Sequence, residues 1–469
     1  MVAALCALGA MCATERPARA TGFLTAEFGS DRGQPAIATP YSVYFNPGAL
    51  AGIRESEVVL DIAVAARSME YDRSSSALSP SNPNDPALAG NATYRAANTG
   101  AATLFNVLAG PYVGFVTDFG HSALRLGLAS YVPFGGQVQW DKNSAFGGST
   151  TAPGAYDGPQ RWASIGATTA SLYQTLALAY RFERARLGIG VSASLVRTSV
   201  TDVRARNLDG SDDVFGPGGV TKEGRSELDA SGFQFGAAAG AYWEATSDGA
   251  LRLGVSYTSQ PGFGAMRLNG WFRLQPGTQE ASNPLSSADF VQAYPDIVRA
   301  GAAWRVSPAA ELRLDGSLQR WSRFKNQCVV VPGAMCDVDA SGASASGNVF
   351  LNIPRDWRDA VKVRLGGAYW TQPESEIFGS VAYESSPVGP GHIDALTFDS
   401  TRLYGTLGVR HKFGRSVAAQ FSYTYVYFVP VTANDSSLPN YAAPSTWPSG
   451  NGRYTSELFL FDAALSYSF

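Results

Sequence analysis

Hydrophobic and polar residues alternate along most of this 469-residue chain, and no segment is apolar for long enough to cross a membrane as a helix. In residues 57–71, for example, Val58, Leu60 and Ile62 alternate with smaller or charged neighbours. The pattern returns at 124–129, 187–195, 361–365 and 416–429. A period of two is that of a β-strand, whose successive side chains point to opposite faces of a sheet. Since a helical span needs about 20 mostly apolar residues, we predict an all-β fold.

The composition indicates what these two faces contact. Charged residues make up 16% of the chain, against about 25% in an average protein, while aromatic residues make up 12%. Strands with one face on lipid and the other on water need few charges, and they carry aromatic side chains at the membrane interfaces. The row Phe421, Tyr423, Tyr425 and Tyr427 fits such an interfacial girdle. The net charge of −3 shows no basic footprint, so we expect no nucleic-acid partner.

Both ends of the chain are typical of an exported protein of a Gram-negative outer membrane. Residues 1–13 are apolar and the small-residue motif PARA follows at 17–20, so residues 1–20 are predicted to be a signal peptide. No Lys or Arg precedes the apolar stretch, which suggests that translation begins upstream of Met1; a buried N-terminal helix is the alternative. The last strand ends on Phe469, a C-terminal aromatic residue of the kind that outer-membrane barrels present to their assembly machinery.

Short joints alternate with long polar stretches, as the two ends of a closed barrel require. The short joints lie at 183–184, 248–249, 307–308, 373–374 and 414–415, and the long stretches at 72–100, 135–160, 206–226, 276–290, 325–355, 386–397 and 432–453. Seven long loops predict a 14-stranded antiparallel transmembrane β-barrel with both termini in the periplasm. A plain count gives fifteen strands, because Pro261-Gly262 divides 250–260 from 264–274, so we predict that these two segments form one bent strand.

Residues 21–54 precede the first strand and form a segment rich in Gly, Pro, Ala and Thr, without a sustained period. Irregular backbone at membrane depth is tolerated only where protein shields it or water reaches it. We therefore predict that this segment is a hatch, a plug inside the lumen, and that the barrel spans 55–469. A simple leader into the first strand is the alternative.

Cys328 and Cys336 are the cysteines of the predicted mature chain, and we expect them to form one disulfide in the loop between the ninth and tenth strands. A pair of free thiols is the alternative. The motif DVDASG at 337–342 resembles the start of a calcium loop, but Asn348 stands where the closing Glu belongs. We interpret it as a solvated turn and expect neither a metal nor a cofactor.

Enzymatic chemistry has little support in the sequence. The chain has His121, His392 and His411 as its histidines, and it contains neither a GxSxG nor an HExxH motif. We therefore do not expect an enzyme.

Several short motifs, taken in order, carry a family resemblance. They are Gly22-Phe23 followed by Tyr44-Phe45-Asn46-Pro47-Gly48-Ala49-Leu50, then Val132-Pro133-Phe134-Gly135, Tyr294-Pro295-Asp296-Ile297, Trp321-Ser322-Arg323-Phe324, Asp356-Trp357-Arg358-Asp359-Ala360, Leu365-Gly366-Gly367 and Ser385-Ser386-Pro387-Val388. With these motifs the chain resembles the outer-membrane long-chain fatty acid transporter family, the FadL/TodX-type barrels. The chain departs from the family pattern in carrying Gly48 where the family has Ala, and in a shorter stretch between Gly22 and Asn46.

The resemblance implies passive uptake of a hydrophobic small molecule, a fatty acid or an aromatic hydrocarbon, and most simply a long-chain fatty acid. In such barrels the ligand is captured from outside, enters an interior pocket, and leaves sideways into the outer-membrane lipid through a gap at an inward kink of the third strand. Here that strand is expected over 122–134. The kink region is Ser130, Tyr131, Val132 and Pro133, and the gating residues of the hatch are Gly22, Phe23, Asn46, Pro47 and Gly48. We expect a monomer.

A ligand of this kind needs little chemistry from the protein. Burial of its tail is favourable by about 0.8 kcal/mol per CH₂, and a carboxylate would need one cationic partner. The candidates are Arg197, Arg204, Arg206, Arg358, Lys362 and Arg364. A general diffusion porin and a structural barrel remain alternatives; a steady, large conductance would indicate a porin, because a plugged carrier is nearly silent.

Overall fold

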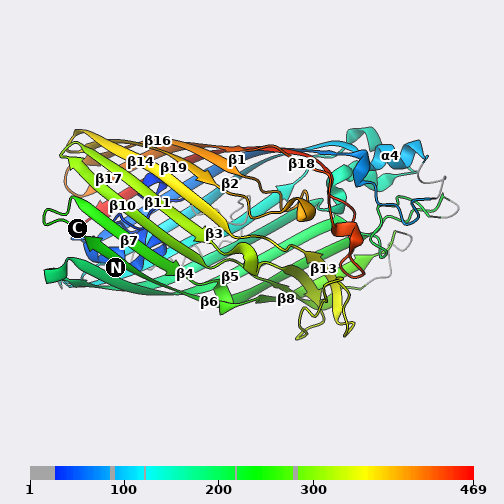
Figure 1. Ribbon diagram of the computed structural model, residues 1–469, viewed down its shortest axis with the longest axis horizontal. Coiled ribbons are helices and arrows are strands. Elements are labelled where there is room, and N and C mark those ends of the chain that lie inside the picture. Colours follow the sequence, from blue (N-terminus) through cyan, green and yellow to red (C-terminus); the bar gives the residue numbers. More distant parts are fainter. Residues whose placement is uncertain (1–26, 85–89, 121–122, 217–218, 278–283) are drawn as a thin grey trace.

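In the computed structural model the chain closes into a barrel of fourteen antiparallel strands, as predicted (Figure 1). The structure describes residues 27–84, 90–120, 123–216, 219–277 and 284–469. Nine wall strands are single elements: β1 (Glu57–Arg73), β2 (Gly100–Thr117), β3 (Leu124–Gln139), β4 (Gly166–Phe182), β5 (Leu187–Ala205), β6 (Arg225–Glu244), β15 (Ser375–Glu384), β16 (Arg402–Phe413) and β19 (Gly452–Ser468). The barrel is closed by β1 and β19, which pair from Glu57↔Ser468 to Arg73↔Gly452.

Five wall strands are made of two successive segments. They are β7 (Leu251–Thr258) with β8 (Met266–Gln275), β9 (Ser286–Gln292) with β10 (Ile297–Ser307), β11 (Ala310–Gln319) with β12 (Asn326–Val330), β13 (Val349–Pro354) with β14 (Ala360–Gln372), and β17 (Val417–Phe428) with β18 (Val431–Ala433). Both β7 and β8 pair with β6, so the strand predicted over 250–274 is indeed one bent strand. It is interrupted where Pro261 lacks an amide donor and Gly262 adopts a φ of 78°.

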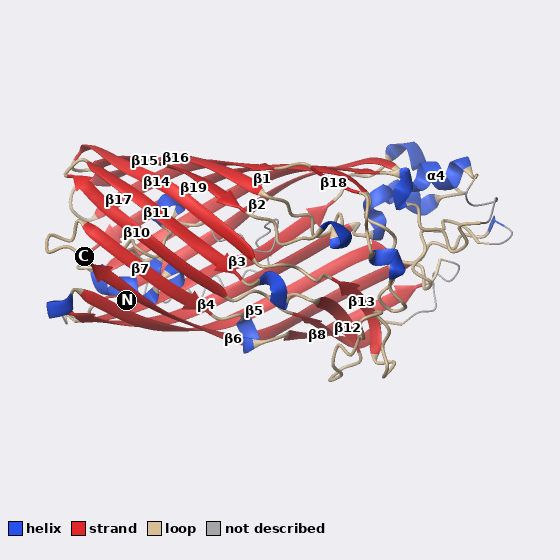
Figure 2. Ribbon diagram, viewed as in Figure 1, coloured by secondary structure: helices blue, strands red, loops and turns tan. Residues whose placement is uncertain are grey.

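The period-two pattern matches the two faces of the wall. Leu60 and Ile62 of β1 are exposed on the outer surface, whereas Val59 and Asp61 between them are buried in the lumen. Val361, Val363 and Leu365 of β14 are exposed in the same way. The described residues include no helix long and apolar enough to cross a membrane. Figure 2 shows that strands build the wall and that helices are confined to the hatch, the loops and the joints.

The long loops gather at one end of the barrel and the short joints at the other (Figure 1). The helices are α2 (Ser42–Phe45) and α4 (Ala92–Asn98), with 3₁₀ turns η1 (Ser30–Arg32), η2 (Pro47–Gly52), η3 (Ser75–Ala77), η4 (Ser144–Phe146), η5 (Pro153–Asp157), η6 (Pro159–Trp162), η7 (Glu183–Ala185), η9 (Pro261–Phe263), η10 (Trp321–Arg323), η11 (Pro390–His392) and η12 (Leu438–Asn440). Buried ion pairs hold the loops together, among them Arg161 with Glu223 and Arg73 with Asp212.

Two boundaries predicted from the sequence are wrong. The third strand does not end near Pro133, because β3 continues to Gln139 after an irregularity at that proline. Cys328 lies in β12 and not in the loop, since this strand continues the ladder of β11 beyond a short break. In both places the strand resumes after the interruption, at Val132-Pro133 in β3 and at the 3₁₀ turn Trp321–Arg323 between β11 and β12.

Cys328 is bonded to Cys336 in the loop that follows β12. We predict that the mature protein is two hydrogens lighter under non-reducing conditions than after reduction. Closing so short a loop is expected to stabilise it locally by about 2–3 kcal/mol. Intact mass analysis with alkylation checks this; alkylation of both thiols without a reductant would contradict it.

Candidate functional site

The hatch lies inside the barrel, near the end that carries the short joints (Figure 1). Its described part runs from residue 27 to 54, and the side chains from Phe28 to Ile53 are mostly buried against the inner wall. Two of the predicted gating residues, Gly22 and Phe23, lie outside the described residues. The other three, Asn46, Pro47 and Gly48, lie where α2 meets η2.

Asn46 attaches the hatch to the wall. Its side chain is fully buried, and its Nδ2 donates hydrogen bonds to the carbonyl oxygen of Pro35 at 2.8 Å and to that of Ala241 in β6 at 2.9 Å. Its Oδ1 accepts from the amide of Gly48 at 3.0 Å. One side chain therefore closes the turn, ties it to another part of the hatch, and fixes it to the barrel.

Glycines in the wall let this turn lie directly on the strands. A Cβ atom on Gly240 of β6 would overlap Oδ1 of Asn46, and one on Gly190 of β5 would overlap the carbonyl of Pro47. A Cβ atom on Gly48 itself would lie 2.5 Å from the carbonyl oxygen of Gly240. The departure from the family's Ala at position 48 is thus explained, since the backbones approach too closely here for a methyl group.

Ion pairs hold the rest of the hatch. Asp31 pairs with Arg313 of β11 at 2.6 Å, and Glu27 pairs with Lys362 of β14. Arg364 donates to the carbonyl oxygens of Ser30 and Gly33. Lys362 and Arg364, predicted as partners of a ligand carboxylate, are therefore placed by the structure against the hatch.

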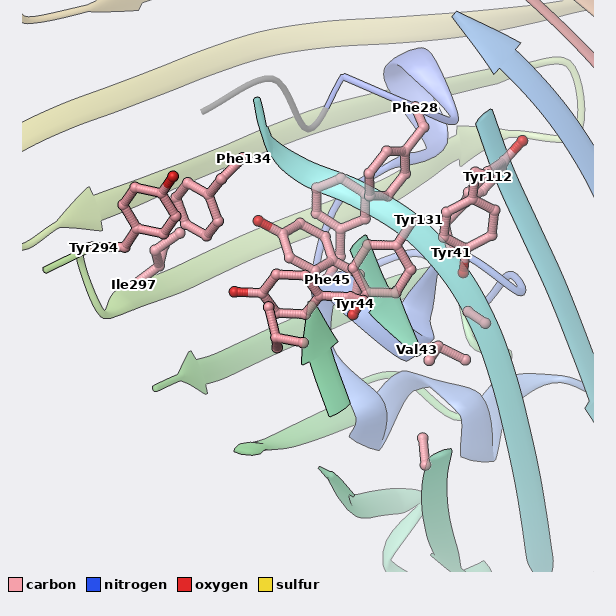
Figure 3. Packing of buried hydrophobic residues seen from close by; sticks show 14 of the residues in the cluster. Phe28, Tyr41, Val43, Tyr44, Phe45, Tyr112, Tyr131, Phe134, Tyr294 and Ile297 are labelled. Atoms are coloured by element: carbon pink, nitrogen blue, oxygen red, sulfur yellow. The ribbon is translucent and has the colours of Figure 1, made fainter. Parts of the chain in front are cut away.

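Aromatic side chains from the hatch and the wall form a continuous layer across the lumen (Figure 3). Phe28 of the hatch packs against Tyr112 at 4.7 Å and against Tyr131 of β3 at 5.5 Å between ring centroids. The layer continues through Phe134, which stacks on Tyr294 at 4.6 Å, and through Trp321 and Trp357, which pack together at 4.9 Å. We call it the aromatic layer.

A cavity, the upper cavity, lies next to this layer and is bordered by Trp321 and Trp357. Its apolar lining comprises Val138, Val200, Leu228, Phe290, Ile353, Leu396 and Phe398. Leu396 and Phe398 belong to the loop after β15, which folds into the barrel and is buried there. Such a lining suits the hydrophobic part of a ligand.

Three guanidinium groups line the upper cavity, and they differ in their partners. Arg204 pairs with Asp202, and Arg402 pairs with Glu384 at 3.1 Å and with Asp399 at 3.3 Å. Arg67 of β1 forms no ion pair with any described residue.

Arg67 instead contacts neutral groups, although its residue is only 5% exposed. It donates to Ser456 Oγ at 3.0 Å and to the carbonyl oxygen of Phe398 at 3.4 Å, and it stacks over Phe428. Among the residues that the structure describes, Arg67 is therefore the guanidinium of this cavity without a carboxylate at ion-pair distance; Asp399, which also borders the cavity and pairs with Arg402, interacts with it only from further away.

Of the six cations predicted to bind a carboxylate, only Arg204 borders the upper cavity. Arg197 is exposed on the outer wall, where it lies over Phe233, so it cannot reach a lumenal ligand. Arg358 is also exposed and does not line this cavity. Arg67 is not among the cations predicted from the sequence to bind a carboxylate. Its position among the inward-facing residues of the first strand could have identified it as a lumenal cation.

Arg206 lies further out, at the base of the extracellular loops. It borders an outer cavity of about 850 Å³ with Leu208, Val220 and Lys222, and it stacks on Trp447 at 3.9 Å. Burial, together with the nearby Arg204, lowers the pKa of the Arg206 guanidinium. An anion bound there would reduce the free-energy cost of keeping this group charged.

The wall is interrupted between β2 and β3. The two strands pair in a ladder only from Tyr112↔Tyr131 to Thr117↔Leu126, so that residues 100–111 of β2 keep their ladder pairing with β1 and have none with β3. Beyond the break, Asn106 Nδ2 donates to the Gln137 carbonyl oxygen at 3.4 Å, and the amide of Asp141 donates to the Thr103 carbonyl oxygen at 2.9 Å. The break is therefore bounded at both ends.

A bulge in β3 lies beside the break. The register of β3 with β4 shifts by one residue between Tyr131 and Phe134, at Val132-Pro133. The bulge therefore lies within the kink region predicted from the sequence, which runs from Ser130 to Pro133. Beyond the bulge, Gly136 and Val138 border the upper cavity, while Phe105 of β2 is exposed on the outer surface. The upper cavity therefore reaches the part of β3 that has no ladder pairing with β2.

We predict that Gly240→Ala loosens the hatch, because the added methyl group displaces Asn46. Overpacking of this kind costs about 1–3 kcal/mol, enough to raise the open population of the hatch by roughly 5–150-fold. Single-channel recording should show frequent openings in Gly240→Ala. Gly236→Ala on the same strand is the matched control, since its new Cβ atom meets nothing closer than 3.8 Å. A Gly240→Ala channel as silent as the control would contradict this role.

Comparison with known proteins agrees with the geometry. The sequence profile of the family described as outer membrane protein transport protein (OMPP1/FadL/TodX) matches residues 32–469. A FadL homologue of Pseudomonas aeruginosa superimposes over 97% of this chain and 99% of that one, with a TM-score of 0.71 and 17% identity. The toluene transporter TbuX of Ralstonia pickettii superimposes over 96% and 99%, with a TM-score of 0.59 and 15% identity.

A putative outer membrane protein of Neisseria meningitidis is 21% identical over 221 residues, and the match spans only 45% of that protein and 44% of this chain. At these identities the solved structures establish the fold, whereas the family profile covers nearly the whole chain. The chain therefore belongs to the outer membrane protein transport protein family (OMPP1/FadL/TodX), the outer-membrane barrels that transport hydrophobic compounds.

Proposed function

We propose that this barrel takes up an amphiphile with one anionic headgroup, most simply a long-chain fatty acid, and releases it sideways into the outer membrane. One observation carries the proposal: the upper cavity is apolar, contains the unpaired guanidinium of Arg67, and borders the break between β2 and β3. Each of these three features matches one requirement, namely a tail site, a head site and an exit.

The buried charge of Arg67 argues for an anionic headgroup. A charge taken out of water without a partner costs several kcal/mol, and an opposite charge at hydrogen-bond distance offsets much of that cost. The neighbouring cations already have carboxylate partners. A carboxylate of the ligand at Arg67 would complete the same pairing, with its tail against Phe290 and Leu228.

The direction of release follows from what closes the lumen. The aromatic layer and the hatch lie between the upper cavity and the end with the short joints, so passage straight through would require both to move. The break in the wall needs no such movement. The outer cavity at Arg206 supplies a first binding site on the extracellular side.

A neutral aromatic hydrocarbon is the second candidate. Its support is the aromatic lining of the upper cavity, with Phe290, Trp321, Trp357 and Phe398, and the likeness to proteins described as toluene transporters. Such a ligand would leave Arg67 without an anion, so the two candidates differ in their dependence on this side chain.

We predict that Arg67→Met lowers fatty-acid uptake about tenfold or more, the effect of losing a charged hydrogen bond worth roughly 1.5–3 kcal/mol, and leaves toluene uptake unchanged. Uptake of radiolabelled oleate and of toluene by cells or proteoliposomes would measure it. Arg197→Met on the outer wall is the control. An equal loss for both compounds would indicate damage to the cavity, and no loss for oleate would reject the head site.

We further predict that deleting Pro133 blocks release. The bulge holds one extra residue, so this deletion restores the register of β3 with β4 and allows β3 to pair further along β2. Uptake of every ligand should fall to background, while oleate still co-purifies with the barrel in native mass spectrometry. If a structure of the deletion variant shows that β3 has lost the bulge and uptake still proceeds at the normal rate, this exit is ruled out.

A further inference from the structure

We propose that Asp61 and Asp462 share one proton and that this pair latches the hatch, so that the hatch loosens when the periplasmic end becomes alkaline. The inference goes beyond uptake itself and rests only on the hatch closing the lumen. Its test reads ion conductance, which does not depend on the identity of the ligand.

The two carboxyl groups lie on neighbouring strands and contact each other in the lumen. Asp61 of β1 is 5% exposed and Asp462 of β19 is 4% exposed, and the two side chains are in hydrogen-bonding contact. Oδ1 of Asp61 and Oδ2 of Asp462 are buried without any donor. Two oxygens that can only accept do not hydrogen-bond unless a proton lies between them.

No cation neutralises the pair. Neither carboxylate forms an ion pair with any described Lys, Arg or His, whereas the hatch residues Asp31 and Glu27 pair with Arg313 and Lys362. Two buried carboxylates in contact cannot both carry a charge at moderate cost, so one proton is retained between them.

The pair also holds the hatch directly. Oδ2 of Asp61 accepts hydrogen bonds from the Tyr41 hydroxyl at 2.6 Å and from the Gly29 amide at 2.8 Å. Gln420 of β17 lies at 3.5 Å from both Oδ1 of Asp462 and the Gly29 carbonyl oxygen. The proton therefore lies at the point where hatch and wall meet.

A small cavity lies beside the partners of this pair. It is lined by Tyr41 and Gln420, which contact Asp61 and Asp462, and it extends to Arg32, Glu57 and Arg410. The titratable and charged groups that surround the pair are Glu27, Arg32 and Tyr41 of the hatch, Glu57 of β1, Tyr112 of β2 and Arg410 of β16. Since β1 begins at Glu57, this cavity lies toward the end with the short joints, and the pair responds to pH on that side.

Removing the proton leaves two negative charges in contact, and this repulsion must be relieved by solvation. The wall cannot yield, because β1 and β19 are paired along their whole length. The hatch contacts at Tyr41 and Gly29 depend on side-chain hydrogen bonds to Asp61 and can yield. The proton-bound form is stable at low pH, and the latch is lost as the pH rises through the value at which the proton leaves.

The test records single channels of the full-length barrel between about pH 6 and about pH 9.5, a range in which no exposed carboxylate changes its charge. We expect the open probability of the native protein to rise with pH by up to about tenfold per pH unit while the proton is lost. In Asp462→Asn the amide donates to Asp61 in place of the proton, so the channel should remain closed throughout. Asp61→Asn also removes the repulsion between the two carboxylates. It serves as the test variant if Asp462→Asn fails to assemble.

Asp315→Asn is the matched control. Asp315 pairs with Arg364, which holds the hatch at Ser30 and Gly33, so this variant should raise the open probability at every pH and keep the native slope. A native channel whose open probability is flat across the range overturns the proposal. So does an unchanged pH slope in both Asp462→Asn and Asp61→Asn, which would assign the response to Arg410, Tyr41 or another neighbour.

Discussion

The structure depends on one requirement: inside hydrocarbon every backbone amide and carbonyl must be hydrogen-bonded within the protein. A closed ladder of antiparallel strands meets it, and β1 and β19 complete that ladder without a gap. The break between β2 and β3 is the exception, and it occurs where β3 bends away from β2 at Val132-Pro133. At this break the edge of β2 pairs with β1 but not in a ladder with β3.

The interior follows from the same closure, because side chains that point inward from distant strands are forced together. Most charges there are balanced, as Arg313 shows with Asp31, Glu311 and Glu376. Among the described residues, two of the departures from this balance concern the upper cavity and the hatch. Arg67 has no carboxylate at ion-pair distance, and Asp61 and Asp462 form no ion pair with a cation. Unbalanced buried charge is costly, and this cost is the reason for proposing an anionic ligand in one case and a shared proton in the other.

Much of the fold could be predicted from local pattern, whereas the site could not. Alternation placed the strands, and turn residues divided them, because these signals lie within a few residues of one another. The same alternation excludes Arg197 as a partner of a lumenal ligand, because Arg197 continues the outward-facing row from Leu187 to Leu195. Arg67, Asp61 and Asp462 escaped notice because each is an ordinary inward-facing residue by itself. Their significance depends on which side chains of other strands lie opposite, and that is fixed only when the barrel closes.

Arg67 and Asp61 lie on the same face of β1, six residues apart, which corresponds to about 20 Å along a strand. Arg67 belongs to the upper cavity, and Asp61 contacts the hatch on the far side of the aromatic layer. On the proposed route, a ligand held at Arg67 would leave through the break in the wall without contacting Tyr41. Uptake and closure then become separable properties of one lumen. A variant at Arg67 should change what enters the membrane, and a variant at Asp61 or Asp462 should change only whether the lumen leaks.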